Sequence, residues 1–560
     1  MPGAFSHLAL ADRLREHCRE SEFSPIHSQP EHFNWGSMGP DVLFFHPDDW
    51  IILKDYFELL FGLYDCFDEI LDLYKKLRDT YENIIDWKTG GVYSELQRTT
   101  EALKITITSF AAKLLTDKVD FFEIIKPPMH AKPGEHDRKN WWWIDIGHHY
   151  RTGDLANTLA AKASNVKQKS YAFGYAAHIG ADVIGHPYVN VISSGPYRNH
   201  WRRHVLVEKV IDTYLWQHWN GERLSSSRAY RKLQTTPGTG FSIEDSFCNY
   251  LSDCFNSVYE PLGKAPITDE QVHFMFSTFY RWVRDSSKQS TLNLPKPELF
   301  DWFDLPETIR DRISQLQSSQ PSVQVPSGAL SLGSIKRFLR SIAELALWSL
   351  EVAVSIVLLP EAVIANLSAT GLRYLNWLAL RAIYDLSYNV RLSLSLAGYV
   401  HPEPEMLSTH FGKIVNPSEF LSLYTEVFPH ERYHNSNQTY HLIHPLEIQV
   451  NNPEYPRSNV LPAFPLNLPE GLFEGWDDAA HINALLSTPT LSSIEKAIDS
   501  LRNLQGLSVC PFAKHLMNRI ALGTNDIPNW NLDGDRGYGW PTWKTSATKP
   551  WSNLSDFSII

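Results

Sequence analysis

Cysteine is scarce in this chain, with five residues among 560 at scattered positions. Disulfide frameworks and cysteine-rich zinc sites need paired, regularly spaced cysteines, so neither is expected, and the pattern suits a reducing compartment. An excess of positive charge is also missing, because 51 lysines and arginines face 63 aspartates and glutamates for a net charge of −12. Broad affinity for nucleic acid is therefore not expected, and we predict no specific nucleic-acid partner.

A leader and a membrane span are not evident either. The first 20 residues lack the apolar run and small-residue cleavage site of a secretory signal. We therefore expect a cytoplasmic location, or secretion by a route without a cleaved signal. The most apolar region, 335–400, contains LALWSLEVAVSIVLL, which is shorter than the ~20 residues of a spanning helix and is interrupted by Glu351. Two interpretations stay open for it: a buried helical hairpin, or a surface that enters or lies on a membrane.

Helical periodicity dominates the first half of the chain. Long stretches before residue 310 repeat apolar residues at intervals of three and four, which is typical of helices with one buried face. We therefore predict a mainly α chain. Its predicted parts are a helical domain over 1–313, a polar linker over 314–334, an apolar helical segment over 335–400 and an irregular region rich in aromatics and proline over 401–560. The sequence carries no signal for the oligomeric state.

The segment AHIGADVIGHPYVN, residues 177–190, places His178, Asp182 and His186 at intervals of four. On a helix such residues lie one above another on the same face. A row of three polar groups among Ala, Gly, Ile and Val is costly to bury unless something binds between the side chains. The row therefore predicts a metal site.

Other candidate ligands accompany this row. WRRHVLVEKV places His204 and Glu208 four apart on a second predicted helix. Imidazole and carboxylate are suitable zinc donors, and no thiolate accompanies them. The donors are too many for one tetrahedral ion and indicate two or three, an arrangement used for displacement at phosphorus. The candidates further upstream are His7, Asp41, Asp145, His148 and His149.

Over roughly residues 1–220 the chain resembles the trinuclear-zinc phospholipase C superfamily, which includes zinc phospholipases C, a phospholipase D and single-strand-specific nucleases. The likeness is closest to the zinc-dependent phospholipase C branch and implies a multi-helical, zinc-binding catalytic domain. It is carried, in this order, by His7, Asp41, His149, His178-x-x-x-Asp182-x-x-x-His186 and His204-x-x-x-Glu208.

The resemblance implies how the ligands divide among three zinc ions. His149 is preferred to His148 because an aromatic residue follows the family's histidine, as Tyr150 follows His149. His148 would then be a partner of a ligand or an ordinary surface residue. The first ion would take His149, Asp41, His178 and Asp182, the second His186, His204 and Glu208, and the third His7 with Asp182 as the bridge.

The resemblance also implies a ligand at the N-terminus. In the family, the third ion takes the amino group and carbonyl of the first mature residue, five positions before the first histidine. Removal of Met1 would leave Pro2 at this distance from His7. Pro2 is therefore a predicted zinc ligand, and the alternative is that it is only a disordered chain end.

The activity implied by the resemblance is a phospholipase C that uses zinc-activated water to cleave phospholipids such as phosphatidylcholine into diacylglycerol and a phosphorylated head group. Peripheral membrane contact would go through 335–400. The alternatives are a single-strand-specific nuclease, a phospholipase D-type hydrolase and a non-hydrolytic protein that reuses the fold. The predicted catalytic carboxylates are Asp41, Asp145 and Asp182, of which Asp41 or Asp145 would orient the water. The candidates for binding the phosphate are Arg151, Arg198, Arg202 and Arg203.

Overall fold

The structure is a computed structural model of the chain. Its regular elements in the described residues are all helices, which confirms the predicted mainly α class. The described residues are 3–48, 142–149, 151–193, 197–235, 241–287, 305–322, 400–404 and 509–527, with single positions at 529, at 532, between 61 and 79 and between 341 and 395.

The helices follow one another through the described ranges, and short 3₁₀ turns (labelled η) join several of them. In chain order the elements are α1 (Ala4–His17), η1 (Ser21–Phe23), α2 (Ser24–Ser28), α3 (Pro30–Met38), η2 (Gly39–Phe45), α8 (Trp143–His149), α9 (Thr152–Lys162), α10 (Val166–Ser193), α11 (Tyr197–Asn220), α12 (Leu224–Ser227), η4 (Ala229–Leu233), α13 (Asp245–Tyr259), η5 (Glu260–Leu262), α14 (Asp269–Ser287), α15 (Glu307–Ser318) and α26 (Val509–Ala521).

Contacts within the chain group it into two units. One unit comprises 1–54, 127–288 and 397–560, and it contains every predicted metal ligand. The other comprises 55–126 and 289–396, a pairing that the linear division read from the sequence did not include. In this second unit the Trp348 indole donates a hydrogen bond to the Leu316 carbonyl at the end of α15. The predicted linker and apolar segment lie mostly outside the described residues, so their structure stays a prediction.

Within the described helices, none is both long and apolar enough to cross a membrane.

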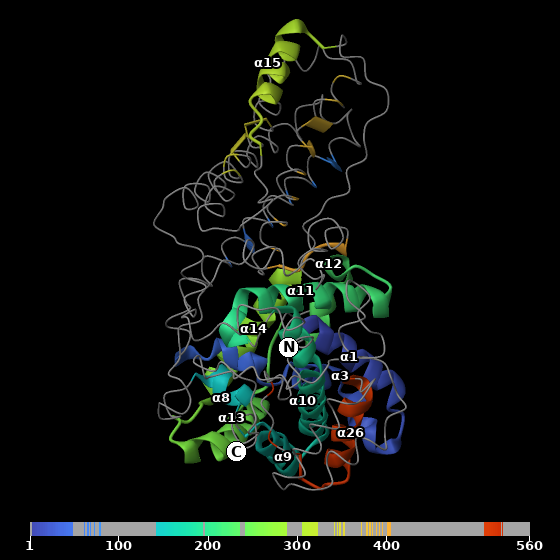
Figure 1. Ribbon diagram of the computed structural model, residues 1–560, viewed down its shortest axis with the longest axis vertical. Coiled ribbons are helices and arrows are strands. Elements are labelled where there is room, and N and C mark those ends of the chain that lie inside the picture. The colour runs from blue at the N-terminus through green and yellow to red at the C-terminus, as the bar shows by residue number, and fades with distance from the viewer. Residues whose placement is uncertain are drawn as a thin grey trace, which may run out of the picture. The chain divides into compact units, whose positions relative to one another are not determined.

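Helix α10 is the central element of the first unit and packs against α3, α9, α11 and α26 (Figure 1). Its sequence is apolar on nearly every face, as expected of a helix that is buried all round. Small residues let its neighbours approach closely. A Cβ atom at Gly174 would lie 2.2 Å from the carbonyl oxygen of Phe33 on α3, so only glycine fits this contact. The central part of α10, with His178 and Asp182, is therefore fully enclosed.

Helix α26 lies within residues 401–560, which the sequence predicts to be irregular. It buries Phe512, Leu516 and Met517 and packs against α10. Its Ala513 touches α10 so closely that a Cβ at Gly180 would lie 2.6 Å from the Ala513 Cα. This part of the C-terminal region is therefore integrated into the core around α10.

Candidate metal centre

The row predicted on residues 177–190 lies on one continuous helix, α10. His178 and Asp182 are completely buried and His186 is nearly so. Because the three residues are spaced by four, neighbouring helices can add ligands on the same side. Two groups of side chains result, one around His178 and Asp182 and one around His186.

The first cluster begins where α1 meets α10. His178 Nε2 lies 2.9 Å from Asp182 Oδ2, and His7 Nε2 of α1 lies 3.4 Å from Asp182 Oδ1. The rings of His7 and His178 stack with their centroids 4.4 Å apart. Each carboxylate oxygen of Asp182 therefore faces a different imidazole, which is the arrangement of a bridging ligand.

Asp41 and His148 complete the first cluster. Asp41 lies in η2, just after the turn at Gly39, and its Oδ1 is 3.1 Å from Nε2 of His148 in α8. The ligand atoms of Asp41, His148 and His178 all lie within 4.8 Å of one another. The first cluster, as the term is used below, consists of His7, Asp41, His148, His178 and Asp182.

The second cluster consists of His186, His204 and Glu208. His204 Nε2 lies 3.1 Å from Glu208 Oε1 on α11, and the rings of His186 and His204 are 5.3 Å apart. The Glu208 side chain retains 16% exposure, close to the 14% of Asp41 in the first cluster, so each cluster contains a ligand that solvent reaches. Burial opposes ionisation of Glu208, but nearby positive charge, to which His204 contributes, lowers its pKa to about 2.

Three histidines are oriented in the same way. The carbonyl oxygens of Ser37 and Ile144 lie 3.0 and 2.8 Å from Nδ1 of His178 and His148, and the Leu532 carbonyl contacts Nδ1 of His186. A carbonyl oxygen only accepts, so each Nδ1 carries the proton and each Nε2 is left to face its cluster. Metal-binding histidines are commonly fixed by such a bond.

The distances and the unpaired atoms fit zinc. Two donors bound at ~2.0–2.1 Å to one tetrahedral zinc lie about 3.3–3.4 Å apart, close to the separations across Asp182. A deprotonated Nε2 beside a carboxylate oxygen is unfavourable unless a cation lies between them. Within the described residues, several buried atoms here lack a hydrogen-bond partner, a state that costs about 1–3 kcal/mol for each group. These atoms are Nδ1 and Nε2 of His7, Nε2 of His178 and both carboxylate oxygens of Asp182.

The protonation states also suit metal binding. Burial lowers the pKa of His7, and the nearby His178 lowers it further. Burial would raise the pKa of Asp182, but His178 and His7 hold it below its usual range. At neutral pH the Asp182 carboxylate is therefore ionised and the His7 imidazole neutral, which are the forms that bind zinc.

The structure places His148 beside Asp41, where the resemblance places His149. The resemblance favours His149 as the ligand beside Asp41, whereas the structure brings His148 to Asp41 and His178 and buries it. His148 is therefore not a surface residue. The His149 side chain lies outside the described residues, so its role stays a prediction.

Arg151 is a predicted phosphate-binding residue whose side chain the structure describes. Its Nη1 donates to the Val258 carbonyl at 3.2 Å, and its Nε lies 3.8 Å from Asp154 Oδ2. These contacts hold the guanidinium between α9 and α13. Outside the described residues are Pro2 and the side chains of Asp145, His149, Arg198, Arg202 and Arg203.

Residues far along the chain also support the centre. Leu532 accepts from His186 Nδ1 with its carbonyl, and its N–H donates to the His148 carbonyl at 2.8 Å. One residue thus connects a histidine of each cluster. Sequence reasoning missed Leu532 because backbone contacts carry no residue-type signal. The nearby Asn529 and Ile527 also bond to α9, and so help to hold this segment in place.

Comparison with known proteins agrees with this geometry. Residues 6–256 match the sequence model of a family described as zinc dependent phospholipase C. The matched region contains every predicted ligand except Pro2. No curated protein and no solved structure matches the chain.

Proposed function

We propose, from the match of residues 6–256 to the zinc dependent phospholipase C family, that the chain hydrolyses phospholipids such as phosphatidylcholine to diacylglycerol and a phosphorylated head group. The family supports zinc-dependent phospholipase C chemistry in general. The choice of phosphatidylcholine and of the glycerol-side bond is our proposal.

One observation carries the proposal: Asp182 lies completely buried between His7 and His178, with neither oxygen hydrogen-bonded within the described residues. An ionised carboxylate in such a place is strongly destabilising unless cations compensate it. A bridge between two ions satisfies both of its oxygens. If the chain reused the fold without zinc, a protonated His178 would have to supply the compensating charge.

The two clusters would hold two or three zinc ions, and we favour three. One ion would take Asp41, His148 and Nε2 of His178, a second would take His7 with Asp182 as the bridge between the two, and the second cluster would bind a third. Zinc supplies a water that is deprotonated near neutral pH and a positive charge that stabilises the phosphoryl oxygens.

Asp41 is our candidate for orienting the attacking water. It is only partly buried, unlike Asp182, and its Oδ1 is already paired with His148. Its second oxygen is therefore the one that can accept a hydrogen bond from water and align a lone pair toward phosphorus. Asp145 remains an alternative for this role, as the sequence predicts.

Recognition of the substrate involves residues further from the clusters. Because Arg151 is engaged with Val258 and Asp154, we propose that Arg198, Arg202 and Arg203 are the stronger candidates for the phosphate. Arginine suits this role because it forms paired hydrogen bonds to phosphate oxygens. We further propose that the apolar region 335–400 provides contact with the lipid surface.

The test compares head-group release from phosphatidylcholine vesicles with cleavage of single-stranded DNA, using the full-length protein with its zinc content measured. We expect lipid turnover by the wild type and a loss of at least about 10³-fold in His178→Ala. The matched control is His273→Ala, an exposed histidine on α14 that should retain wild-type turnover.

Two results would contradict this account. Cleavage of DNA without lipid turnover would replace the substrate and favour the nuclease alternative. A protein that binds no zinc, or a His178→Ala variant with full activity, would remove the basis of the mechanism.

A further inference from the structure

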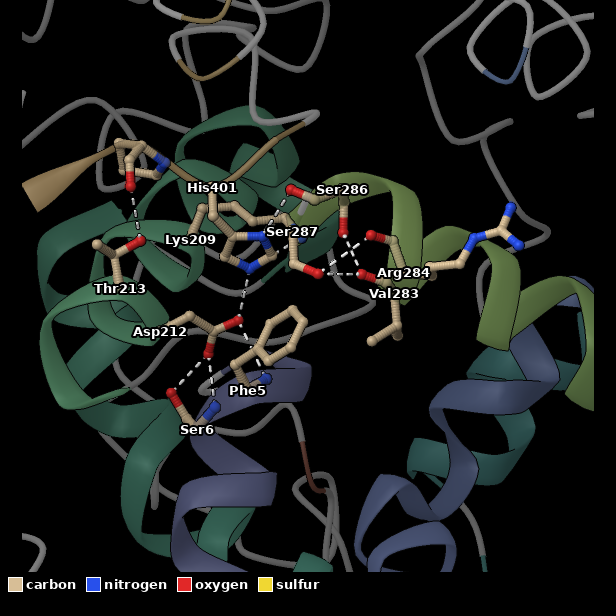
Figure 2. Close-up of polar contacts among 11 residues, drawn as sticks. Phe5, Ser6, Lys209, Asp212, Thr213, Val283, Arg284, Ser286, Ser287 and His401 are labelled. Carbon is tan, nitrogen blue, oxygen red and sulfur yellow. Dashed lines mark hydrogen bonds and ion pairs between the residues drawn. The ribbon is translucent and has the colours of Figure 1, made fainter. Parts of the chain in front are cut away.

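Asp212 of α11 is a buried carboxylate that the proposed chemistry does not use. It lies one turn after Glu208 and is completely enclosed. Its Oδ1 accepts hydrogen bonds from the N–H of Ser6 at 2.8 Å and the Ser6 hydroxyl at 2.6 Å, and its Oδ2 accepts from the N–H of Phe5 at 3.3 Å (Figure 2). Asp212 thus binds the first turn of α1.

Helix α1 lacks a cap of its own. Its N-cap residue is Gly3, which has no side chain, and its first turn contains no acidic residue. The exposed N–H groups at a helix start favour a carboxylate, which here comes from another helix. The approach is so close that a Cβ at Gly3 would lie 2.4 Å from Asp212 Oδ2. Glycine at position 3 therefore makes room for this cap.

His401 holds Asp212 from the other side. Its Nε2 lies 2.9 Å from Asp212 Oδ2, and its backbone N–H donates to the Ser286 carbonyl at the end of α14 at 3.1 Å (Figure 2). The His401 ring also packs edge-on against Phe5, with centroids 4.8 Å apart. Lys209 Nζ, 3.3 Å from His401 Nε2, adds a positive charge near the buried carboxylate. His401 therefore connects α14, α11 and α1.

The first turn of α1, which Asp212 caps, is adjacent to His7, a predicted zinc ligand whose ring is not oriented by a carbonyl. His7 follows Ser6, and neither of its ring nitrogens has a hydrogen-bond partner within the described residues. His148, His178 and His186 are each oriented by a carbonyl, but His7 is not. The position of the His7 ring therefore depends on where the first turn of α1 is held.

We propose that Asp212 and His401 are positioning residues of the metal centre. Asp212 fixes the first turn of α1 so that His7 reaches Asp182, and His401 keeps Asp212 in place. His401 lies outside residues 6–256, the region that matches the family. The inference rests on the proposed zinc centre.

The first part of the test measures zinc per chain by elemental analysis after dialysis against graded chelator concentrations. In Asp212→Asn we expect one zinc to bind at least about 10-fold more weakly, the effect typical of losing a group that orients a ligand. His401→Ala should act in the same direction. His401→Gln should recover part of the loss, because its amide can still donate to Asp212.

Thr213→Val is the matched control. Thr213 follows Asp212 and donates to the Pro402 carbonyl at 3.1 Å, so its hydrogen bond goes to the segment that carries His401 and not to α1. Its variant should bind zinc like the wild type. The thermal unfolding midpoint of each variant separates loss of zinc from loss of the fold.

A double-mutant comparison distinguishes positioning from general stability. If Asp212 acts through His7, adding Asp212→Asn to His7→Ala should cause no further loss of zinc, whereas independent effects would add. Wild-type zinc affinity in both Asp212→Asn and His401→Ala would overturn this inference but would leave the proposed function intact. Absence of zinc in the wild type would instead overturn the proposed function.

Discussion

The two clusters occupy successive turns of the same helix but are supported in different ways. In the first cluster, the carbonyls that orient His178 and His148 come from Ser37 and Ile144, inside the region that matches the family. In the second, His186 is oriented by Leu532, which lies far beyond that region. The carbonyls that orient the first cluster thus come from the region that matches the family, whereas the one that orients His186 comes from the C-terminal part, which contacts the first cluster only through the backbone of His148.

Enclosure varies within each cluster. His7, His178 and Asp182 have no exposed surface, whereas the side chains of Asp41 in the first cluster and Glu208 in the second remain partly exposed. An ion held by His7 and Asp182 should therefore exchange slowly, and an ion beside Glu208 more readily. Asp41 and Glu208 are the ligands that solvent reaches most directly.

Replacing each of the two neighbouring histidines of α8 by alanine, in separate variants, tests the assignment of the first cluster most directly. His148→Ala should weaken zinc binding in the first cluster by at least about 100-fold, because it removes a donor rather than a supporting group. His149→Ala is the matched variant, measured by the same chelator competition. If zinc affinity falls in His149→Ala and not in His148→Ala, the assignment of the first cluster is wrong.

The dependence of the second cluster on Leu532 can be tested with two substitutions at that position. Leu532→Pro removes the N–H that donates to His148 and should displace the carbonyl that orients His186. We expect zinc affinity to fall by about 10-fold or somewhat more in a chelator titration. Leu532→Ala keeps both backbone groups and should lose stability without this loss of affinity. Equal zinc affinities in the two variants would show that the backbone contacts do not support the cluster.

The smallest expected effect concerns the support of the first cluster. His46 follows η2, and its ring packs at a tilt against Trp143 of α8, which joins the elements that carry Asp41 and His148. Burial lowers the pKa of His46 to about 3. The His46 imidazole takes up a proton near pH 6.5 in the unfolded chain but only near pH 3 in the folded chain. The free energy of unfolding therefore decreases as the pH falls through this interval.

Urea unfolding at pH 7 and pH 5.5 measures this contribution. The wild type should lose about 1 kcal/mol more than His46→Phe over this interval. The exposed His273→Ala variant should behave like the wild type. An unchanged pH dependence in His46→Phe would mean that His46 is not the acid-sensitive group.

The sequence alone predicts the parts of the site that depend on local geometry. His178, Asp182 and His186 fall on one face because of helical spacing, and His204 and Glu208 do so for the same reason. The helical class follows likewise from the apolar periodicity.

Contacts between distant segments could not be predicted. His148 and His149 are neighbours on one helix, and the contact of His148 with Asp41, 107 positions earlier, could not be read from their spacing. Leu532 acts through its backbone, and no residue pattern marks it. His401 is an isolated histidine whose role depends on Asp212, 189 positions earlier.

The central claim is that these clusters form a zinc centre, and diffraction from crystals of the full-length protein at the zinc absorption edge tests it most directly. We predict anomalous peaks beside Asp41, His148 and His178, between His7 and Asp182, and between His186, His204 and Glu208. A map of zinc-supplemented crystals with no peak in either cluster would contradict it.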